Sequence, residues 1–312
     1  MKPFIPAAVL LAFLATAVRA EVPRRSVVLT FDDLPLVPPA DLAASQRATE
    51  SLLCVLREHR APAAGFVNED KVHVPGEIDE RIALLGRWLD AGAVLGNHTY
   101  SHANLRDQPL AEFEDDFLHG EVITRRLLAE RGIQTLYFRY PYTNTGPTQE
   151  VKESFEAFLR SRGYTNAPFT VEHADYIYNS LWLDARSRGD AEGAARLREA
   201  YLEHLDRAFT FFEELSRDTF GREIPQILLI HANEINADCL DEMLDRLEAR
   251  GYAFIGLDDA LLDPAYGTPD EYVGRNGPSW LHRWRAGLGL PSRLRDEPDP
   301  PAWVLQAYQA LR

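Results

Sequence analysis

Cysteine is scarce in this sequence. The 312 residues include two cysteines, Cys54 and Cys239, so at most one disulfide can form. Cys54 falls late in one predicted helix and Cys239 at the start of another. If the helices all run the same way, as the alternation of strands and helices described below predicts, two such positions lie at different heights, which disfavours a disulfide. We therefore expect two buried, unpaired thiols; the alternative is a disulfide formed in an oxidising compartment.

Positive charge is also in deficit. Lysine and arginine together number 33, against 48 aspartates and glutamates, and the formal net charge is −15. Binding to phosphate groups needs a basic face, so this composition argues against nucleic acid as a partner. The acidity by itself indicates solubility rather than a particular ligand.

Long apolar segments are absent after the N-terminus, and we find no internal repeats or low-complexity tracts. Residues 7–18 are mostly apolar, follow a basic start at Lys2 and lead into Val18-Arg19-Ala20. This pattern is typical of a secretory signal peptide over residues 1–20. A retained membrane anchor is the alternative, but the stretch falls short of the ~20 residues that span a bilayer. We expect an exported protein, periplasmic or secreted, without stable membrane insertion.

Apolar runs and helical spacings alternate along the rest of the chain. Short runs predict seven strands, at 27–33, 63–67, 93–95, 135–139, 164–171, 227–230 and 253–257. Amphipathic spacing predicts helices at 41–60, 78–90, 109–130, 151–160, 190–215 and 237–250. We interpret 190–215 as a long helix against the core, with a lid as the alternative. The alternation predicts a parallel sheet with helical crossovers, and about 250 residues suit a single β/α barrel.

The most informative stretch is Val27 to Pro35, an apolar, β-branched run that ends in Asp32 and Asp33. It is typical of a strand buried on both faces, and Pro35 ends the ladder. Successive side chains of a regular strand point to opposite faces. The two acids therefore require a bend at the Asp-Asp step, or a division in which one acid binds a metal and the other moves a proton.

A second polar group follows another short apolar run. His98 and His102 are four residues apart and meet on one face if the turn between them is helical. With one of the two acids they offer two imidazoles and one carboxylate, a ligand set that leaves positions open for water and substrate. One divalent ion is expected there: zinc first, with cobalt, nickel, manganese or iron as alternatives.

Five ordered motifs resemble those of the polysaccharide deacetylases with a NodB homology domain, carbohydrate esterase family 4. They are Thr30-Phe31-Asp32-Asp33, His98-Thr99-Tyr100-Ser101-His102, Arg139-Tyr140-Pro141-Tyr142, His173-Ala174-Asp175-Tyr176 and Leu229-Ile230-His231. The resemblance covers roughly residues 27–259 and implies a distorted, seven-stranded β/α barrel over residues 21–262. Residues 263–312 would then be a C-terminal extension packed on the barrel. The candidate residues lie at or just after the ends of predicted strands, where barrels build their active sites.

The resemblance implies roles for the residues on the side of the attacking water. Asp33, His98 and His102 would hold the ion, and Asp32 would be the general base that takes the proton of the water. Arg139 would pair with Asp32, keep it ionised and fix its orientation.

The remaining candidates would serve the substrate and the leaving group. His231 would protonate the departing nitrogen, with Asp175 as the carboxylate that raises its pKa. The backbone N–H of Tyr142, after Pro141, resembles the oxyanion donor of the family, while the side chain of Tyr142 would be a wall of the site. Leu229 points the same way as His231, two residues on along a strand, and would line the pocket for the acetyl methyl group.

Several positions depart from the family pattern or leave alternatives open. Leu34 stands where glycine is common, and we expect it to narrow the entrance beside the metal; Tyr176 stands where tryptophan is common. Asp184 is an alternative to Asp175, and His173 is close enough in sequence to face the site. The extension carries three tryptophans, which we expect to dock on the barrel, with a sugar-stacking platform as the alternative: Trp280, Trp284 and Trp303.

The resemblance implies a metal-dependent hydrolase that removes N-acetyl groups from an amino-sugar glycan, such as peptidoglycan or a chitin-like oligosaccharide. The same nucleophile and oxyanion site can attack an ester, so an O-acetyl esterase acting on xylan, or another small amide or ester hydrolase, is the first alternative. A non-catalytic glycan-binding protein that uses the tryptophans of the extension is the second.

Overall fold

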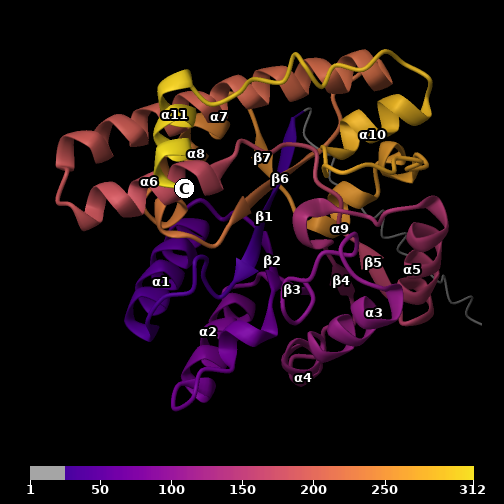
Figure 1. Cartoon of the computed structure of the whole chain (residues 1–312), viewed down its shortest axis with the longest axis horizontal. Coiled ribbons are helices and arrows are strands. Elements are labelled where there is room, and N and C mark those ends of the chain that lie inside the picture. Colours follow the sequence, from indigo (N-terminus) through magenta and orange to yellow (C-terminus); the bar gives the residue numbers. More distant parts are fainter. Residues whose placement is uncertain (1–24) are drawn as a thin grey trace, which may run out of the picture.

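Seven short strands form the centre of the protein, each parallel to the strands it pairs with (Figure 1). The computed structural model describes residues 25–312, so the predicted signal peptide lies outside the described residues. The strands are β1 (Ser26–Leu34), β2 (Ala63–Val67), β3 (Val94–Asn97), β4 (Leu136–Phe138), β5 (Tyr164–Asn166), β6 (Gln226–His231) and β7 (Ala253–Phe254). Their order is β5-β4-β3-β2-β1-β6, and β7 pairs with the start of β1.

The sheet closes on itself through the segment that follows β5. The N–H of Ala167 donates to the carbonyl of Phe138 at the end of β4, and four residues later Val171 forms a bridge with Leu228 of β6. The prediction of a distorted, seven-stranded β/α barrel is confirmed. The single strand predicted at 164–171 is wrong in detail, because its first part pairs with β4 and its last residue with β6.

The helices lie around these strands (Figure 1). They are α1 (Leu42–Glu58), α2 (Ile78–Asp90), α3 (Leu110–His119), α4 (Val122–Glu130), α5 (Gln149–Ser161), α6 (Asp175–Ser187), α7 (Ala191–Phe220), α8 (Glu234–Ala249), α9 (Leu257–Leu261), α10 (Trp280–Gly287) and α11 (Ala302–Leu311), with short 3₁₀ turns η1 (Glu69–Val72), η2 (Pro141–Thr143) and η3 (Pro264–Gly267). Helix α6 was not among the helices predicted from the sequence.

The single helix predicted at 109–130 is also wrong, because the chain breaks at Gly120 between α3 and α4. A Cβ atom at Gly120 would lie 2.5 Å from the backbone carbon of Thr99 and the nitrogen of Tyr100. Glycine is therefore required for the close approach of this corner to the loop that carries the two histidines. The break between α3 and α4 thus lets this corner pack against the histidine loop.

Helix α7 is the longest element and packs on the core. Its first turn is capped by the carboxylate of Asp190, which accepts the N–H of Gly193 at 2.8 Å, and it ends at Gly221 with φ 70°. Six apolar side chains at helical spacing are buried: Leu197, Tyr201, Leu205, Phe209, Phe212 and Leu215. The predicted packed helix is confirmed, and the lid is not, because the apolar stripe has no exposed face to release.

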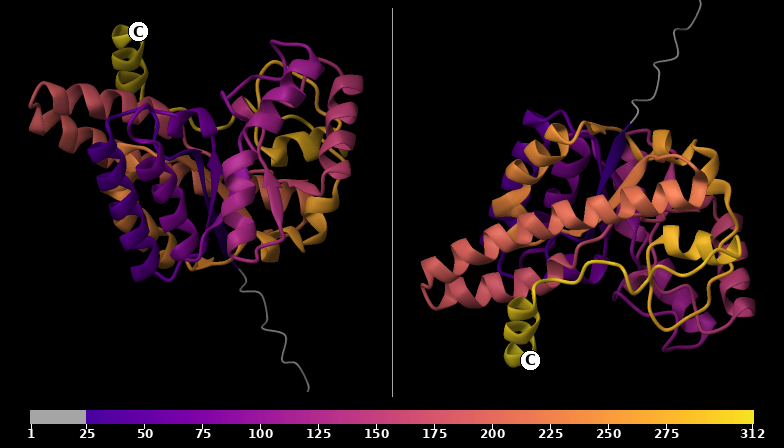
Figure 2. Two further views of the ribbon diagram at one scale, coloured as in Figure 1. Left: turned by 90° about the horizontal axis from the view of Figure 1, so that it is seen from below. Right: turned by 90° about the horizontal axis from the view of Figure 1, so that it is seen from above.

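The C-terminal extension, residues 263–312, runs along α7 and ends in α11 beside α6 (Figure 2). Trp280 and Trp284 are buried and belong to the main core cluster. Trp303 is half-buried, with the guanidinium of Arg196 4.0 Å from its ring centroid. The tryptophans therefore dock the extension on the barrel, as expected.

The two thiols are free, but the prediction that both are buried is wrong for one of them. Cys239 is buried in α8, whereas Cys54 is exposed on α1. Position 54 lies about 200° around the helix from Leu52, so it faces away from the buried stripe. None of the helices within residues 25–312 has the length and apolar character needed to span a bilayer.

Candidate active site

The predicted bend at the acid pair is present at the end of β1. The register with β2 shifts between Phe31 and Leu34, and Asp33 has a left-handed backbone with φ 68°. This bulge aims the carboxylates of Asp32 and Asp33 into the same cavity although they are adjacent. It also turns Leu34 into the core, where the side chain is fully buried. The expectation that Leu34 narrows the entrance is therefore wrong.

The two histidines meet through an irregular loop rather than a helical turn. Thr99 and His102 have left-handed backbones with φ 61° and 58°, and residues 98–102 contain no helix. Side chains of two asparagines hold the loop: Asn97 Oδ1 accepts the N–H of Thr99 at 2.7 Å, and Asn68 Nδ2 donates to the carbonyl of His98 at 2.6 Å. The imidazole ring centroids come within 5.0 Å of each other.

Asp33, His98 and His102 form a cluster suited to one metal ion. A carboxylate oxygen and one ring nitrogen from each histidine all lie within 4.8 Å of one another. His98 Nδ1 is 2.8 Å from the carbonyl of Arg139, which can only accept, so Nδ1 carries the proton and Nε2 has its lone pair free. Burial lowers the pKa of both imidazoles, which keeps them in the neutral form that binds metals. The residues present fit a divalent ion.

Lys71 lies beside this cluster and was not predicted from the sequence. Its Nζ is 3.0 Å from Asp33 Oδ1 and 3.0 Å from Asn68 Oδ1. Burial alone would favour the neutral acid, but the cationic Lys71 holds the pKa of Asp33 well below its usual range. Asp33 is therefore an ionised carboxylate that already has one cationic neighbour.

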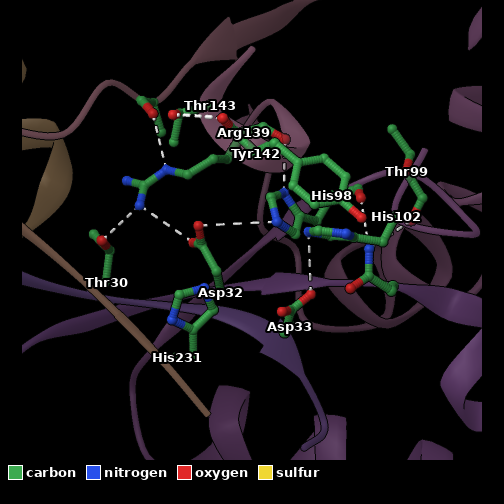
Figure 3. A network of polar contacts seen from close by, with 12 residues as sticks. Thr30, Asp32, Asp33, His98, Thr99, His102, Arg139, Tyr142, Thr143 and His231 are labelled. Carbon is green, nitrogen blue, oxygen red and sulfur yellow. Dashed lines mark hydrogen bonds and ion pairs between the residues drawn. The ribbon is translucent and has the colours of Figure 1, made fainter. Parts of the chain in front are cut away.

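Asp32 lies between the cluster and a buried arginine (Figure 3). Its Oδ1 accepts from Arg139 Nη1 at 3.2 Å, and its Oδ2 is 3.8 Å from His98 Nε2. Arg139 is itself held by Thr30 Oγ1 at 2.9 Å and by the carbonyl of Ala167 at 3.0 Å. Burial raises the pKa of Asp32 to about 6, although Arg139 opposes the rise. Burial thus brings the pKa of Asp32 close to neutrality in spite of the neighbouring guanidinium.

His231 faces the same cavity from the end of β6, opposite Asp32 in the strand register. Its Nδ1 donates to Asp175 Oδ1 at 2.7 Å, and its backbone N–H donates to Asp175 Oδ2 at 2.8 Å. Asn233 and Asn236 donate to the same carboxylate at 2.9 and 2.7 Å. Burial opposes protonation, but Asp175 raises the pKa of His231 to about 10. His231 is an imidazolium with Nε2 left for a ligand.

A cavity of about 510 Å³ joins these groups. It is lined by Asp32, Asp33, His98, His102, Tyr142, Thr143, Phe169, Glu172, Tyr176, Leu229, His231 and Gly277. Tyr142 and Tyr176 expose 59% and 51% of their surface, so each presents an aromatic face at the cavity. Burial raises the pKa of Glu172 to about 7, and the carboxylate of Glu297 in the extension adds to this rise.

Some predicted residues lie elsewhere. Arg139 and Asp175 are buried behind the cavity wall, and Pro141 is buried at the start of η2. His173 is stacked on Tyr201, with ring centroids 4.8 Å apart, and does not line the cavity. Asp184 pairs with Arg188 on the outer face of α6 and does not contact His231. Of the two acids considered for His231, the structure therefore brings Asp175 to it.

Other residues of the site were missed. Lys71 follows β2, so the rule that functional groups follow strands would have found it. Asn233 and Asn236 lie two and five residues after His231, and their amide donors suit a carboxylate. Four other lining residues have no recognisable sequence signal, because their place in the site depends on contacts between distant segments: Phe169, Glu172, Thr143 and Gly277.

Comparisons with known proteins agree with this geometry. Residues 19–165 match the family described as polysaccharide deacetylase. Over 119 residues the chain is 33% identical to the peptidoglycan-N-acetylglucosamine deacetylase of Bacillus cereus. These residues make up 38% of this chain and 37% of that protein.

Two solved structures show a similar fold. The chitin deacetylase of the fungal pathogen Colletotrichum lindemuthianum is 22% identical with a TM-score of 0.53, covering 78% of this chain and 89% of that one. A family 4 carbohydrate esterase pseudoenzyme from Bacillus anthracis is 18% identical with a TM-score of 0.50, covering 76% and 65%. The seven-stranded barrel, its ordered motifs and the match over residues 19–165 together confirm the resemblance that the sequence indicated: the chain is similar to the polysaccharide deacetylase family.

Proposed function

We propose that the protein is a metal-dependent hydrolase that removes N-acetyl groups from an amino-sugar glycan. One observation carries this proposal: a single cavity brings together a ligand cluster, a carboxylate of near-neutral pKa and a histidine whose pKa is raised to about 10. Hydrolysis of an amide needs a water nucleophile, a base for its proton and an acid for the departing amine. The ligand cluster would supply the water nucleophile, Asp32 the base and His231 the acid.

Asp33, His98 and His102 would hold the ion, which supplies a Lewis acid and lowers the pKa of water from 15.7 to as little as about 7. Asp32 takes the proton of the attacking water. Its Oδ2 lies beside His98 Nε2, and Arg139 fixes its other oxygen, so the carboxylate is oriented before substrate binds. A pKa of about 6 gives Asp32 more basicity than an ordinary aspartate while leaving it ionised at pH 7.

The turn at η2 would stabilise the negative charge that develops on the acetyl oxygen. Tyr142 lines the cavity and its ring lies against His102, with centroids 4.5 Å apart. Tyr142 thus lies beside the ligand cluster, and its N–H is the proposed oxyanion donor. Loss of one such donor typically costs about a hundredfold to a thousandfold in kcat.

His231 donates a proton to the leaving nitrogen. Its Nδ1 is bound to Asp175, so the proton comes from Nε2, and the raised pKa keeps that proton in place at neutral pH. An amine is a poor leaving group unless it is protonated, and an imidazolium held by a buried carboxylate meets this need. This feature favours an amide over an ester as the natural substrate, so the esterase remains the second candidate.

The proposed substrate class rests on the family and on the shape of the site. The named relatives are a peptidoglycan and a chitin deacetylase, and both of those substrates carry N-acetylglucosamine. Here two exposed tyrosine rings, Tyr142 and Tyr176, stand at the same cavity, and aromatic faces suit the apolar faces of sugar rings. Leu229 lines the cavity two residues before His231, where the acetyl methyl group would lie.

Acetate release tests this proposal. Purified protein is assayed on N-acetylglucosamine oligomers and on peptidoglycan before chelation, after chelation and after readdition of zinc, cobalt, nickel, manganese or iron. We expect activity that chelation removes and one ion restores, with one equivalent bound. A protein that binds metal yet releases acetate only from chromogenic esters would favour the esterase. A protein that binds no metal would overturn both, since the comparison with a pseudoenzyme shows that this fold alone does not guarantee activity.

A further inference from the structure

The C-terminal extension holds the turn that carries Tyr142. Thr143 Oγ1 donates to the carbonyl of Gly277 at 2.6 Å, and Asn144 Nδ2 donates to the carbonyl of Arg275 at 3.0 Å. The guanidinium of Arg283 donates to the carbonyl of Thr143. Two consecutive residues after Tyr142 are thus bound to a segment more than 130 positions away.

Gly277 lies so close to this turn that no residue with a side chain could take its place. A Cβ atom there would lie 1.8 Å from Thr143 Oγ1 and 2.5 Å from the carbonyl oxygen of Tyr142. These distances exclude every side chain, so glycine is required for contact rather than for backbone freedom. Gly277 also lines the cavity, which makes the extension a wall of the active site.

Arg283 connects the turn to the extension through several hydrogen bonds. Its side chain is fully buried, and besides Thr143 it donates to the carbonyl of Pro278 at 2.9 Å and to Asp270 Oδ2 at 3.3 Å. The guanidinium carbon lies 3.9 Å from the ring centroid of Trp280. A planar group with five donors can bind all three partners at once, which a lysine cannot do.

Residues 270–283, which we call the brace, are anchored on the barrel at both ends. Lys152 of α5 lies 2.8 Å from Asp270 Oδ2, and Ser279 Oγ donates to the carbonyl of Thr170 at 2.7 Å. The N–H of Trp280 donates to the carbonyl of Phe169, a residue that lines the cavity. The segment 270–283 therefore links the Tyr142 turn to Phe169, another residue that lines the cavity.

The turn needs such support because its own conformation is strained. Tyr142 and Thr143 have left-handed backbones with φ 54° and 52°, a region that residues other than glycine rarely adopt. Thr143 is also β-branched, which makes this conformation less favourable still. Strained backbone persists where surrounding contacts fix it, and here these contacts come from the extension.

We propose that residues 270–283 are a functional part of the active site, with Arg283 as a positioning residue that fixes the N–H of Tyr142 toward the acetyl oxygen. The inference rests on the proposed function for the role of that N–H. It adds that the site is incomplete without a segment outside both the matched residues 19–165 and the five motifs.

The first test is Gly277→Ala, with Gly267→Ala as its matched control. Gly267 lies in the same extension, has no left-handed backbone, and a Cβ atom there would meet nothing within 4 Å. We expect Gly277→Ala to lower kcat about a hundredfold with KM within about twofold and metal content unchanged. Hydrogen exchange of the amides at 142–146 should be faster in this variant, while the control matches the wild type in both measurements.

The second test separates positioning from mere stability. Arg283→Lys should lower kcat about tenfold at a temperature where the variant is fully folded, and added guanidinium should restore part of the kcat of Arg283→Ala. If Arg283 acts on stability alone, both variants will melt at lower temperature while the folded fraction keeps the wild-type kcat, and the proposal is then wrong.

Two further outcomes keep the two proposals apart. Wild-type kcat in Gly277→Ala, or a lowered kcat without faster exchange at 142–146, would overturn the role of the brace while leaving the proposed function intact. An inactive wild-type protein would overturn the proposed function, and with it the catalytic role of the brace; the exchange rates would still report whether the turn is held.

Discussion

The two sides of the cavity differ in composition and in how they are held. The lining residues up to Thr143 include the two acids and two histidines, and four of the lining residues on that side have left-handed backbones: Asp33, His102, Tyr142 and Thr143. The lining residues of the other side, from Phe169 to His231, are mostly apolar or aromatic, and Leu229 and His231 stand on the regular strand β6. Left-handed residues other than glycine cost about 1–3 kcal/mol each. Left-handed backbone thus lies at the ligand cluster and at the proposed oxyanion turn, whereas the proposed general acid stands on regular structure.

This contrast predicts that changes on the first side abolish chemistry, whereas changes on the second side tune it. The largest effect is expected for Asp32→Asn, which removes the proposed base but keeps the shape of the side chain. We expect kcat to fall about a thousandfold, with metal content and KM nearly unchanged. Steady-state kinetics and metal analysis of the purified variant measure this.

Asp184→Asn is the control for that experiment. Asp184 is an aspartate on the outer face of α6, paired with Arg188, and does not line the active-site cavity. It should keep wild-type kcat. Equal losses in the two variants would mean that Asp32 has no special role, and the contrast between the two sides would then fail.

The next largest effect concerns pH and the second side. Asp175 raises the pKa of His231 to about 10, so Asp175→Asn removes an anion and must lower the pKa of His231 toward its ordinary value of about 6.5. The wild type should keep its general acid protonated up to about pH 10. The variant should lose activity between about pH 6.5 and 10, so the alkaline limb of kcat moves down by more than one pH unit.

The pH profile of kcat and an NMR titration of the His231 ring test this together. The same pair has a consequence for folding. Its contribution is fully present below the unfolded pKa of His231, about 6.5, and is lost as the pH rises through about 10. An unchanged alkaline limb in Asp175→Asn would show that His231 is not the acid.

Much of this site could be predicted from the sequence, because its chemistry is concentrated in short motifs at strand ends. The run that ends in Asp32 and Asp33 indicated both a buried strand and a bend, and the structure has both. The histidine loop was predicted as a pair but with the wrong geometry. Its shape depends on Gly120, whose close approach arises only when α3 packs against the loop, and on Asn97, whose side chain also donates to the carbonyl of Phe117 in α3.

The rest depended on contacts between distant parts of the chain, which local patterns do not record. Gly277 lines the cavity from a distant segment and acts through the absence of a side chain. Arg283 in isolation resembles any basic residue of an amphipathic helix. The prediction that Cys54 is buried was a simpler error, because the angle between Leu52 and Cys54 around the helix axis follows from the sequence alone.

A smaller effect is expected for Lys71, the cation beside the ligand cluster. A positive charge 3.0 Å from Asp33 Oδ1 opposes the binding of a divalent cation. Lys71→Met should therefore tighten metal binding about tenfold, whereas Lys71→Arg, which keeps the charge, should leave the affinity near the wild-type value. Competition with a chelating indicator measures the affinity without any assay of activity. Weaker binding in Lys71→Met would instead show that Lys71 is needed to hold Asp33 in place.

The smallest effect is expected on the second side, at Glu172. This half-buried acid lines the cavity, and burial together with Glu297 raises its pKa to about 7, so at pH 8 it is mostly ionised. An anion in this wall disfavours glycans that carry carboxylates near the scissile amide and has little effect on neutral ones. Glu172→Gln should raise kcat/KM a few-fold for a carboxylate-bearing peptidoglycan fragment at pH 8. The kcat/KM for neutral N-acetylglucosamine oligomers should stay unchanged. At pH 5.5 the variant should lose its advantage, because Glu172 is then mostly protonated in the wild type. An equal change for both substrates would mean that Glu172 shapes the cavity rather than selecting by charge, and the second side would then tune catalysis by packing alone.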